Sequence, residues 1–128
     1  MSIPVEQARF ARVTKAFASG VLIAHHPEEG IRVLTVDPDF DEQGSAAITG
    51  VRGSILDAAA GDSRMTIVWQ PTVAHGWTLI YDGRVDPASP RLGAGADETD
   101  ALVLTPVSGM LHRPSSHGDG PEWVWPDR

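Results

Sequence analysis

The chain has 128 residues, with 17 acidic and 10 basic side chains that give a formal net charge of −7. Binding to a nucleic acid or an anionic membrane depends on clustered lysine and arginine, so we expect neither as a partner. The chain has no cysteine, which excludes disulfides, thiolate catalysis and cysteine-bound metals.

The length predicts a single domain over residues 1–128. A core of this size does not readily enclose a flat cofactor as large as a flavin within one copy, so a cofactor site would be shared in a homodimer. The N-terminal residues are too charged for a signal peptide or a membrane span, and we expect a cytoplasmic protein.

An N-terminal helix is expected within residues 1–19. Apolar side chains recur at helical spacing after Pro4, a residue that is tolerated in a first helical turn, and Gly20 is a typical stop. We therefore predict one amphipathic helix from Pro4 to Ala18.

Six short strands are expected within residues 21–107. The runs GVLIAHH and IRVLTV, separated by PEEG, predict a hairpin. The run SAAITGV predicts a third strand, and SRMTIVWQP, GWTLIYDGRV and ALVLTPV predict the last three. This order indicates a mainly β domain, with an antiparallel sheet closed towards a barrel.

The remaining segments connect or follow these strands. Between the third and fourth strands, SILDAAA predicts two helical turns that end at Gly61. Residues 86–100 are rich in Pro, Gly, Ala and Asp and predict an exposed loop. Residues 108–128 are expected to form a tail, and its large side chains Trp123 and Trp125 should dock on the domain.

Metal and catalytic motifs fail on their spacing. Asp37, Asp39 and Asp41 alternate as in a calcium loop, but Glu42 stands where the tight-turn glycine is required. The five histidines are scattered or, as neighbours in a strand, point to opposite faces. We therefore predict no metal site, and no acid–base pair identifies a catalytic residue.

The segment GVRGSILDAAAG, residues 50–61, has two interpretations. Ser54 and Asp57 fit a capping box that only stabilises the helix start. Alternatively, Arg52 and the free N–H groups of the helix start could bind a phosphate. The spacing alone favours the two interpretations about equally.

Four segments of residues 21–114, in this order, carry a resemblance to a known family: VLIAHHPEEGIRVLTV, ITGVRGSILDAAAGDSRMTIVW, HGWTLIYDGRV and LTPVSGMLHRP. They resemble small members of the pyridoxamine 5′-phosphate oxidase-like superfamily, the flavin-binding split barrels. The resemblance implies a six-stranded antiparallel split β-barrel with an N-terminal helix and a short helix between strands three and four. It also implies a homodimer with the cofactor at the interface.

The resemblance implies a set of cofactor-binding residues in three groups. The loop and helix start after the third strand, Arg52, Gly53 and Ser54, would bind the cofactor phosphate. Arg32, in the second strand, would make a further contact with the phosphate. The end of the third strand, Ile48, Thr49 and Gly50, would run beside the isoalloxazine or deazaflavin ring.

Two functions follow from the resemblance. The first is an FMN- or deazaflavin-dependent oxidoreductase that transfers hydride to an unknown small molecule, with FMN preferred because the chain is acidic. The alternative is a non-catalytic split barrel that binds a flavin or phosphate ligand, or has lost its cofactor. Gly53 replaces the lysine of the oxidases, and Trp77 and Thr78 replace their later Arg–Gln pair, so pyridoxamine phosphate oxidation is not expected.

Overall fold

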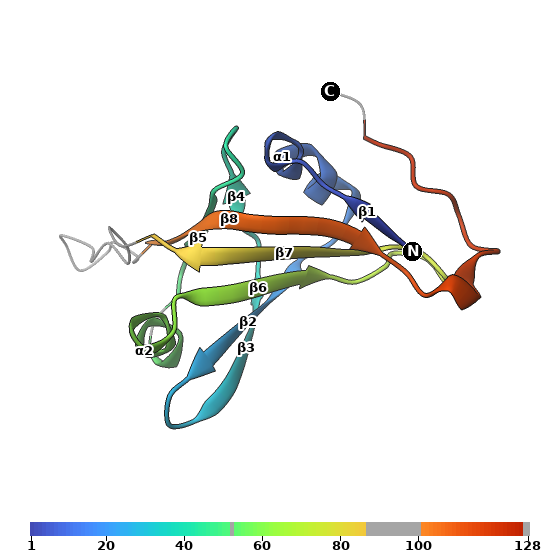
Figure 1. Ribbon diagram of the computed structural model, residues 1–128. Helices are drawn as coiled ribbons and strands as arrows, with labels where there is room; N and C mark the ends of the chain where they lie inside the picture. Colours follow the sequence, from blue (N-terminus) through green and yellow to red (C-terminus); the bar gives the residue numbers. More distant parts are fainter. Residues whose placement is uncertain (52, 87–100, 127–128) are drawn as a thin grey trace.

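A curled antiparallel sheet forms the body of the molecule (Figure 1). The computed structural model describes residues 1–51, 53–86 and 101–126. The strand order is β3-β2-β6-β7-β8-β5-β4, and β1 pairs with β8 beside this path. The strands are β1 (Ser2–Pro4), β2 (Gly20–His26), β3 (Gly30–Val36), β4 (Asp39–Phe40), β5 (Ala46–Thr49), β6 (Arg64–Trp69), β7 (Thr78–Val85) and β8 (Ala101–His112).

The predicted mainly β fold is confirmed, and all six predicted strands are present as β2, β3, β5, β6, β7 and β8. Two short strands, β1 and β4, were not predicted. The last strand extends beyond residue 107 to His112, so residues 108–112 belong to the sheet and the tail begins at Arg113.

The predicted N-terminal helix is present, but its predicted bounds, Pro4 to Ala18, are wrong and it is not a single continuous α-helix. Residues 2–4 instead form β1, in which Pro4 lies opposite Met110 of β8. The helical part is divided into a 3-10 turn (Gln7–Arg9), α1 (Phe10–Val13) and a second 3-10 turn (Thr14–Ala16). Pairing with β8, a contact between residues about a hundred positions apart, overrides the local helical pattern.

The core is centred on an aromatic cluster between α1 and the sheet. Phe10 packs edge-on against Tyr81 of β7 at 5.0 Å between ring centroids and stacks on Phe40 of β4 at 5.3 Å. Its ring lies directly over Gly109 of β8, where an added Cβ would collide with it. A glycine at this position is therefore required for α1 to approach the sheet.

The second helix, α2 (Ser54–Gly61), packs on the β2–β3 hairpin at one end of the sheet (Figure 1). Ile55, Ala58 and Ala59 are its buried residues. Figure 1 shows α2 and the C-terminal tail at opposite ends of the sheet. In the described parts of the chain, no helix has the length and apolar character needed to cross a bilayer.

The single tyrosine, Tyr81, should titrate abnormally. Its hydroxyl lies 2.9 Å from the carbonyl oxygen of Gly44 and 3.1 Å from that of Leu104, and the side chain is fully buried. Burial, and to a lesser degree the Asp41 carboxylate, raises the pKa of Tyr81 well above its usual value. Because only the unfolded chain then ionises near pH 10, the free energy of unfolding should fall as the pH rises above about 10.

Absorbance of phenolate at 295 nm measures this directly. We expect little phenolate signal in the folded protein at about pH 11 and a full signal in denaturant at the same pH. The Tyr81→Phe variant serves as the blank because the sequence contains no second tyrosine. A titration of the folded protein with a midpoint near 10 would contradict the assignment.

Candidate functional site

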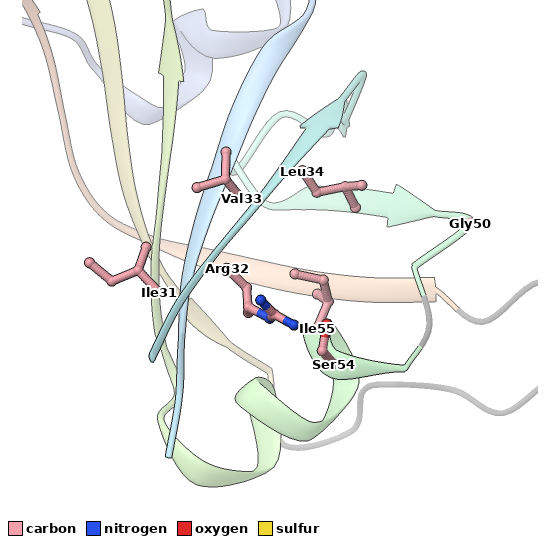
Figure 2. A pocket seen from close by; sticks show the side chains of 7 residues that line it. All are labelled: Ile31, Arg32, Val33, Leu34, Gly50, Ser54 and Ile55. Atoms are coloured by element: carbon pink, nitrogen blue, oxygen red, sulfur yellow. The ribbon is translucent and has the colours of Figure 1, made fainter. Parts of the chain in front are cut away.

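A pocket of about 360 Å³ lies between β3 and the start of α2 (Figure 2). Figure 2 shows Arg32 directed from β3 towards Ser54 and Ile55 of α2. The sheet and the helix start therefore face each other across the pocket. Its lining residues are Ile31, Arg32, Val33, Leu34, Gly50, Ser54 and Ile55.

The β2–β3 hairpin positions Arg32. Arg32 lies opposite the buried residue Ala24 in the strand register, so both side chains are on the face of the hairpin that α2 covers. At the turn, Nδ1 of His26 accepts hydrogen bonds from the N–H groups of Glu28 (3.1 Å) and Glu29 (2.9 Å). This turn brings Glu29 back over the strand.

Glu29 and Arg32 form an ion pair, with Oε2 and Nη2 2.9 Å apart. The two side chains are 50% and 41% exposed, so the pair contributes little to stability and Glu29 can be displaced. The Nε atom of Arg32, in contrast, is buried and has no hydrogen-bond partner among the described residues. A buried donor of this kind is stabilised by an acceptor, and an anion in the pocket would provide one.

The start of α2 directs backbone N–H groups towards the same pocket. Among the described residues, the first helical hydrogen bond runs from the N–H of Asp57 to the carbonyl oxygen of Gly53 (3.1 Å), and no side-chain hydrogen bond caps the helix. The preceding N–H groups, those of Ser54, Ile55 and Leu56, lie before this first helical bond and have no acceptor within α2. They carry the partial positive charge of a helix N-terminus.

The predicted capping box is wrong. Gly53, with a φ of +62°, occupies the N-cap position, and Ser54 is the first helical residue and lines the pocket. The left-handed backbone of Gly53 shifts the helix start by one residue, so the Ser54 hydroxyl makes no capping hydrogen bond. The phosphate-binding interpretation of this segment therefore gains a serine hydroxyl at the pocket.

Asp57 lies outside the pocket. Its carboxylate is 75% exposed and is 4.0 Å from Nε2 of His26. Nδ1 of His26 accepts two N–H groups, so Nε2 is the ring nitrogen on the side of Asp57. The negative charge of Asp57 thus lies on the side of the hairpin turn, and Asp57 is not one of the residues that line the pocket.

The other predicted cofactor residues are divided between the core, the surface and the pocket. Ile48 is buried in the core, Thr49 and Gly53 are exposed, and Gly50 lines the pocket with a φ of +77°. Arg52 lies outside the described residues. The pocket therefore brings together three predicted residues that are separated in sequence, Arg32, Gly50 and Ser54, and their role as ligands stays a prediction.

An apolar surface on the outer face of the sheet adjoins the pocket and was not predicted from the sequence. Ile31 and Val33 of β3 line the pocket and are 61% and 63% exposed. The strand register continues this surface: Val33 lies opposite Ile23, and Val21 lies opposite Val68. We call Ile31, Val33, Ile23, Val21 and Val68 the outer apolar face. The alternation of apolar residues in β3 was the signal that could have revealed it.

A second pocket of about 240 Å³ opens beside the outer apolar face. The strand register shows that the two pockets are neighbours: Ile31 and Val33, which line the first pocket, lie opposite His25 and Ile23, which line the second. The second pocket is more polar: Asp82 accepts a hydrogen bond from Thr66 Oγ1 at 2.6 Å. It is lined by Ile23, His25, Asp62, Arg64, Met65, Thr66 and Asp82.

The acidic run around Asp41 forms a turn. One carboxylate oxygen of Asp41 accepts the N–H groups of Gln43 and Ser45, each at 2.9 Å. Across residues 1–51, 53–86 and 101–126, no three histidine or carboxylate side chains are grouped as metal ligands. His75 and His117, far apart in sequence, do stack at 4.4 Å, a contact that the sequence spacing did not reveal.

Comparison with known proteins identifies the fold. No family model and no curated protein matches the sequence. Among solved structures, an F420 reductase is similar over 81% of this chain and 94% of its own, with 13% identity and a TM-score of 0.59. An FAD-binding protein from Mesorhizobium loti is similar over 87% of this chain and 96% of its own, with 11% identity and a TM-score of 0.59.

A candidate pyridoxamine 5′-phosphate oxidase from Corynebacterium glutamicum is also similar, over 89% of this chain and all of its own, with 11% identity and a TM-score of 0.59. At these identities the likeness concerns the fold, not the activity. The chain has the split-barrel fold of the pyridoxamine 5′-phosphate oxidase-like proteins, as its sequence led us to expect.

Proposed function

We propose that this chain is a flavin- or deazaflavin-dependent oxidoreductase that holds the cofactor phosphate in the pocket between β3 and α2. One observation carries the proposal: Arg32, whose buried Nε has no hydrogen-bond partner among the described residues, lines the same pocket as Ser54, the first residue of α2. A cationic donor and backbone N–H groups that converge on one pocket are suited to a phosphate.

The residues present fit such a group. Arg32 would contribute a charge-assisted hydrogen bond, Ser54 its hydroxyl, and Gly50 a backbone without a side chain at the pocket wall. Arg52 and Gly53 keep the phosphate role that the family resemblance implies. A volume of about 360 Å³ is at the lower end for ligand pockets, which suits a phosphate and its chain better than an entire flavin.

We further propose that a second copy of the chain completes the site as a homodimer. The outer apolar face is exposed beside the pocket. Removing the apolar side chains of Ile31 and Val33 from water in an interface would stabilise a dimer. A partner seated there would enclose the ring system that the pocket is too small to hold. Ile48, Thr49 and Gly50 are proposed to lie beside that ring.

The bound flavin or deazaflavin would supply the hydride chemistry. This chain would anchor the phosphate through Arg32 and the α2 start, and it would exclude water through Ile31 and Val33. The polar pocket that contains His25 and Asp82 offers a place for a small substrate next to the apolar face. No side chain is assigned as a catalytic residue.

FMN is the preferred cofactor because a single phosphate pocket in an acidic chain suits it. The names of the structural neighbours, an F420 reductase and an FAD-binding protein, support a deazaflavin or a flavin in general. The alternative function is a non-catalytic split barrel. It is favoured by the Glu29–Arg32 ion pair, which occupies part of the guanidinium, and by Gly53 at the position of the oxidases' lysine.

Replacing Arg32 with alanine tests the phosphate site. Loss of a charge-assisted hydrogen bond costs about 1.5–3 kcal/mol, so we expect FMN to bind about ten- to a hundredfold more weakly to Arg32→Ala. The measurement is a fluorescence titration of the refolded, ligand-free protein with FMN and, side by side, a deazaflavin. Arg52→Ala, assayed in parallel, should show a similar loss. If the unmodified chain binds neither cofactor, the non-catalytic alternative takes precedence.

Glu29→Gln is the matched control for that variant. It removes the competing carboxylate but keeps Arg32, so FMN should bind the same or a few-fold more tightly. Riboflavin, which has the ring but no phosphate, should bind the parent chain and Arg32→Ala equally. An equal loss of FMN and riboflavin affinity in Arg32→Ala would contradict a phosphate contact and indicate a structural effect.

The proposed dimer predicts that Val33→Glu forms a monomer. A carboxylate at this exposed position of β3 leaves the folded subunit intact but would be buried without a partner in the interface. Sedimentation equilibrium should give twice the mass of one chain for the parent and for Val124→Glu, a control in the exposed tail. A parent chain that stays monomeric at high concentration, or a dimeric Val33→Glu, would overturn the interface.

A further inference from the structure

A third pocket, about 180 Å³ in volume, lies at the end of β6 remote from α2. Three distant segments form it: the end of the N-terminal helical turns, the connection from β6 to β7, and the C-terminal tail, which runs back on the side of α1 (Figure 1). None of its residues lines the proposed cofactor pocket. They are Ala16, Phe17, Thr72, Val73, Gly76, Trp77, Pro121, Glu122 and Trp123.

Defined contacts hold the aromatic walls of this pocket. Phe17 and Trp123 stack with their ring centroids 5.9 Å apart and an interplanar angle of 20°. The indole N–H of Trp77 donates to the carbonyl oxygen of Pro121 at 3.0 Å, which fixes the ring relative to the tail. Arg113, which is buried, donates from Nη1 to the same oxygen at 2.6 Å. The walls are thus in place before any ligand enters.

The chemistry of the walls favours a positive charge. Phe17, Trp77 and Trp123 contribute three π systems, which attract cations; one face of Trp77 is already covered by Arg113, and Phe17 and Trp123 stack on each other. Among the lining residues only Glu122 is charged. The same end of the molecule already uses this interaction, because the guanidinium of Arg9 lies 4.5 Å from the ring centre of Trp125 and that of Arg113 lies 4.3 Å from that of Trp77.

We propose that this pocket binds a small organic cation, an alkylated ammonium group, among the rings of Phe17, Trp77 and Trp123 with Glu122 as its counter-charge. Arg113 is not a lining residue; its Nη1 donates to the carbonyl oxygens of Pro121 and His75, and its guanidinium remains positively charged against the ring of Trp77. Glu122 is therefore the lining residue that supplies the negative charge a bound cation requires. The volume admits a compact head group and is well below that of a drug-sized ligand site. The proposal does not depend on the flavin site.

Calorimetric titration with choline and with tetramethylammonium, at low ionic strength, tests the proposal. The comparison ligand is 3,3-dimethylbutan-1-ol, which has the shape of choline without its charge. We expect saturable binding of both cations and at least about tenfold weaker binding of the alcohol. Equal affinity for choline and the alcohol, or no binding of either cation up to roughly 50 mM, would overturn the proposal.

Three variants locate the ligand. Trp123→Leu should weaken choline binding about fivefold or more, because a ring is lost. Glu122→Gln, on an exposed side chain, should weaken it about two- to threefold and reduce its salt dependence. Val124→Ala, at a neighbour that is 79% exposed and does not line the pocket, should bind like the parent.

Circular dichroism of each variant checks its fold, and FMN titration checks the cofactor pocket separately. If Trp123→Leu does not fold, Glu122→Gln together with the neutral ligand still decides the question. Parental affinity for choline in the folded Trp123→Leu and Glu122→Gln variants would place the cation elsewhere and refute the site. Loss of FMN binding alone would count against the proposed oxidoreductase and leave this site intact.

Discussion

The contact between Phe10 and Gly109 is the constraint that allows the N-terminal helical turns to pack against the curled sheet. Because Gly109 has no side chain, the phenyl ring reaches the backbone of β8 and meets Tyr81 and Phe40. The Tyr81 hydroxyl lies against main-chain oxygens of two other segments at the same place. This cluster joins the N-terminal helical turns to β4, β7 and β8, and so closes one side of the sheet while the outer face stays open.

The candidate cofactor pocket follows from that geometry. On one side of β8 lie β5 and then β4, and on the other side β7, β6 and β2 follow, with β3 as the last strand at that edge. The segment after β5 must then cross towards the β2–β3 hairpin, where α2 packs through Ile55 and Ala58. The start of α2 consequently meets Arg32. The helix start and the half-exposed arginine, which are distant in sequence, therefore line the same pocket.

Local sequence patterns predicted the six main strands and α2, since alternation and turn residues are visible in short windows. They failed for β1, because the pairing of Pro4 with Met110 is a contact between opposite ends of the chain. They also failed at the start of α2, because the left-handed backbone of Gly53 has no signature in the residues around it. The family resemblance predicted Arg32 and Ser54 as cofactor-binding residues, and this role stays a prediction. The Glu29 ion pair, the buried Nε of Arg32 and the aromatic pocket of the tail became visible only in the tertiary structure.

Main-chain oxygens accept many of the side-chain hydrogen bonds that fix this molecule. Pro121 receives Trp77 and Arg113 through its carbonyl oxygen, and the carbonyl oxygens of Gly44 and Leu104 lie next to the Tyr81 hydroxyl. Every amino acid has such an oxygen, so the residue type at an accepting position can change in evolution while the path of the chain is retained. Relatives that preserve this architecture would then share few residues, as do solved structures with 11–13% identity that align with most of the chain.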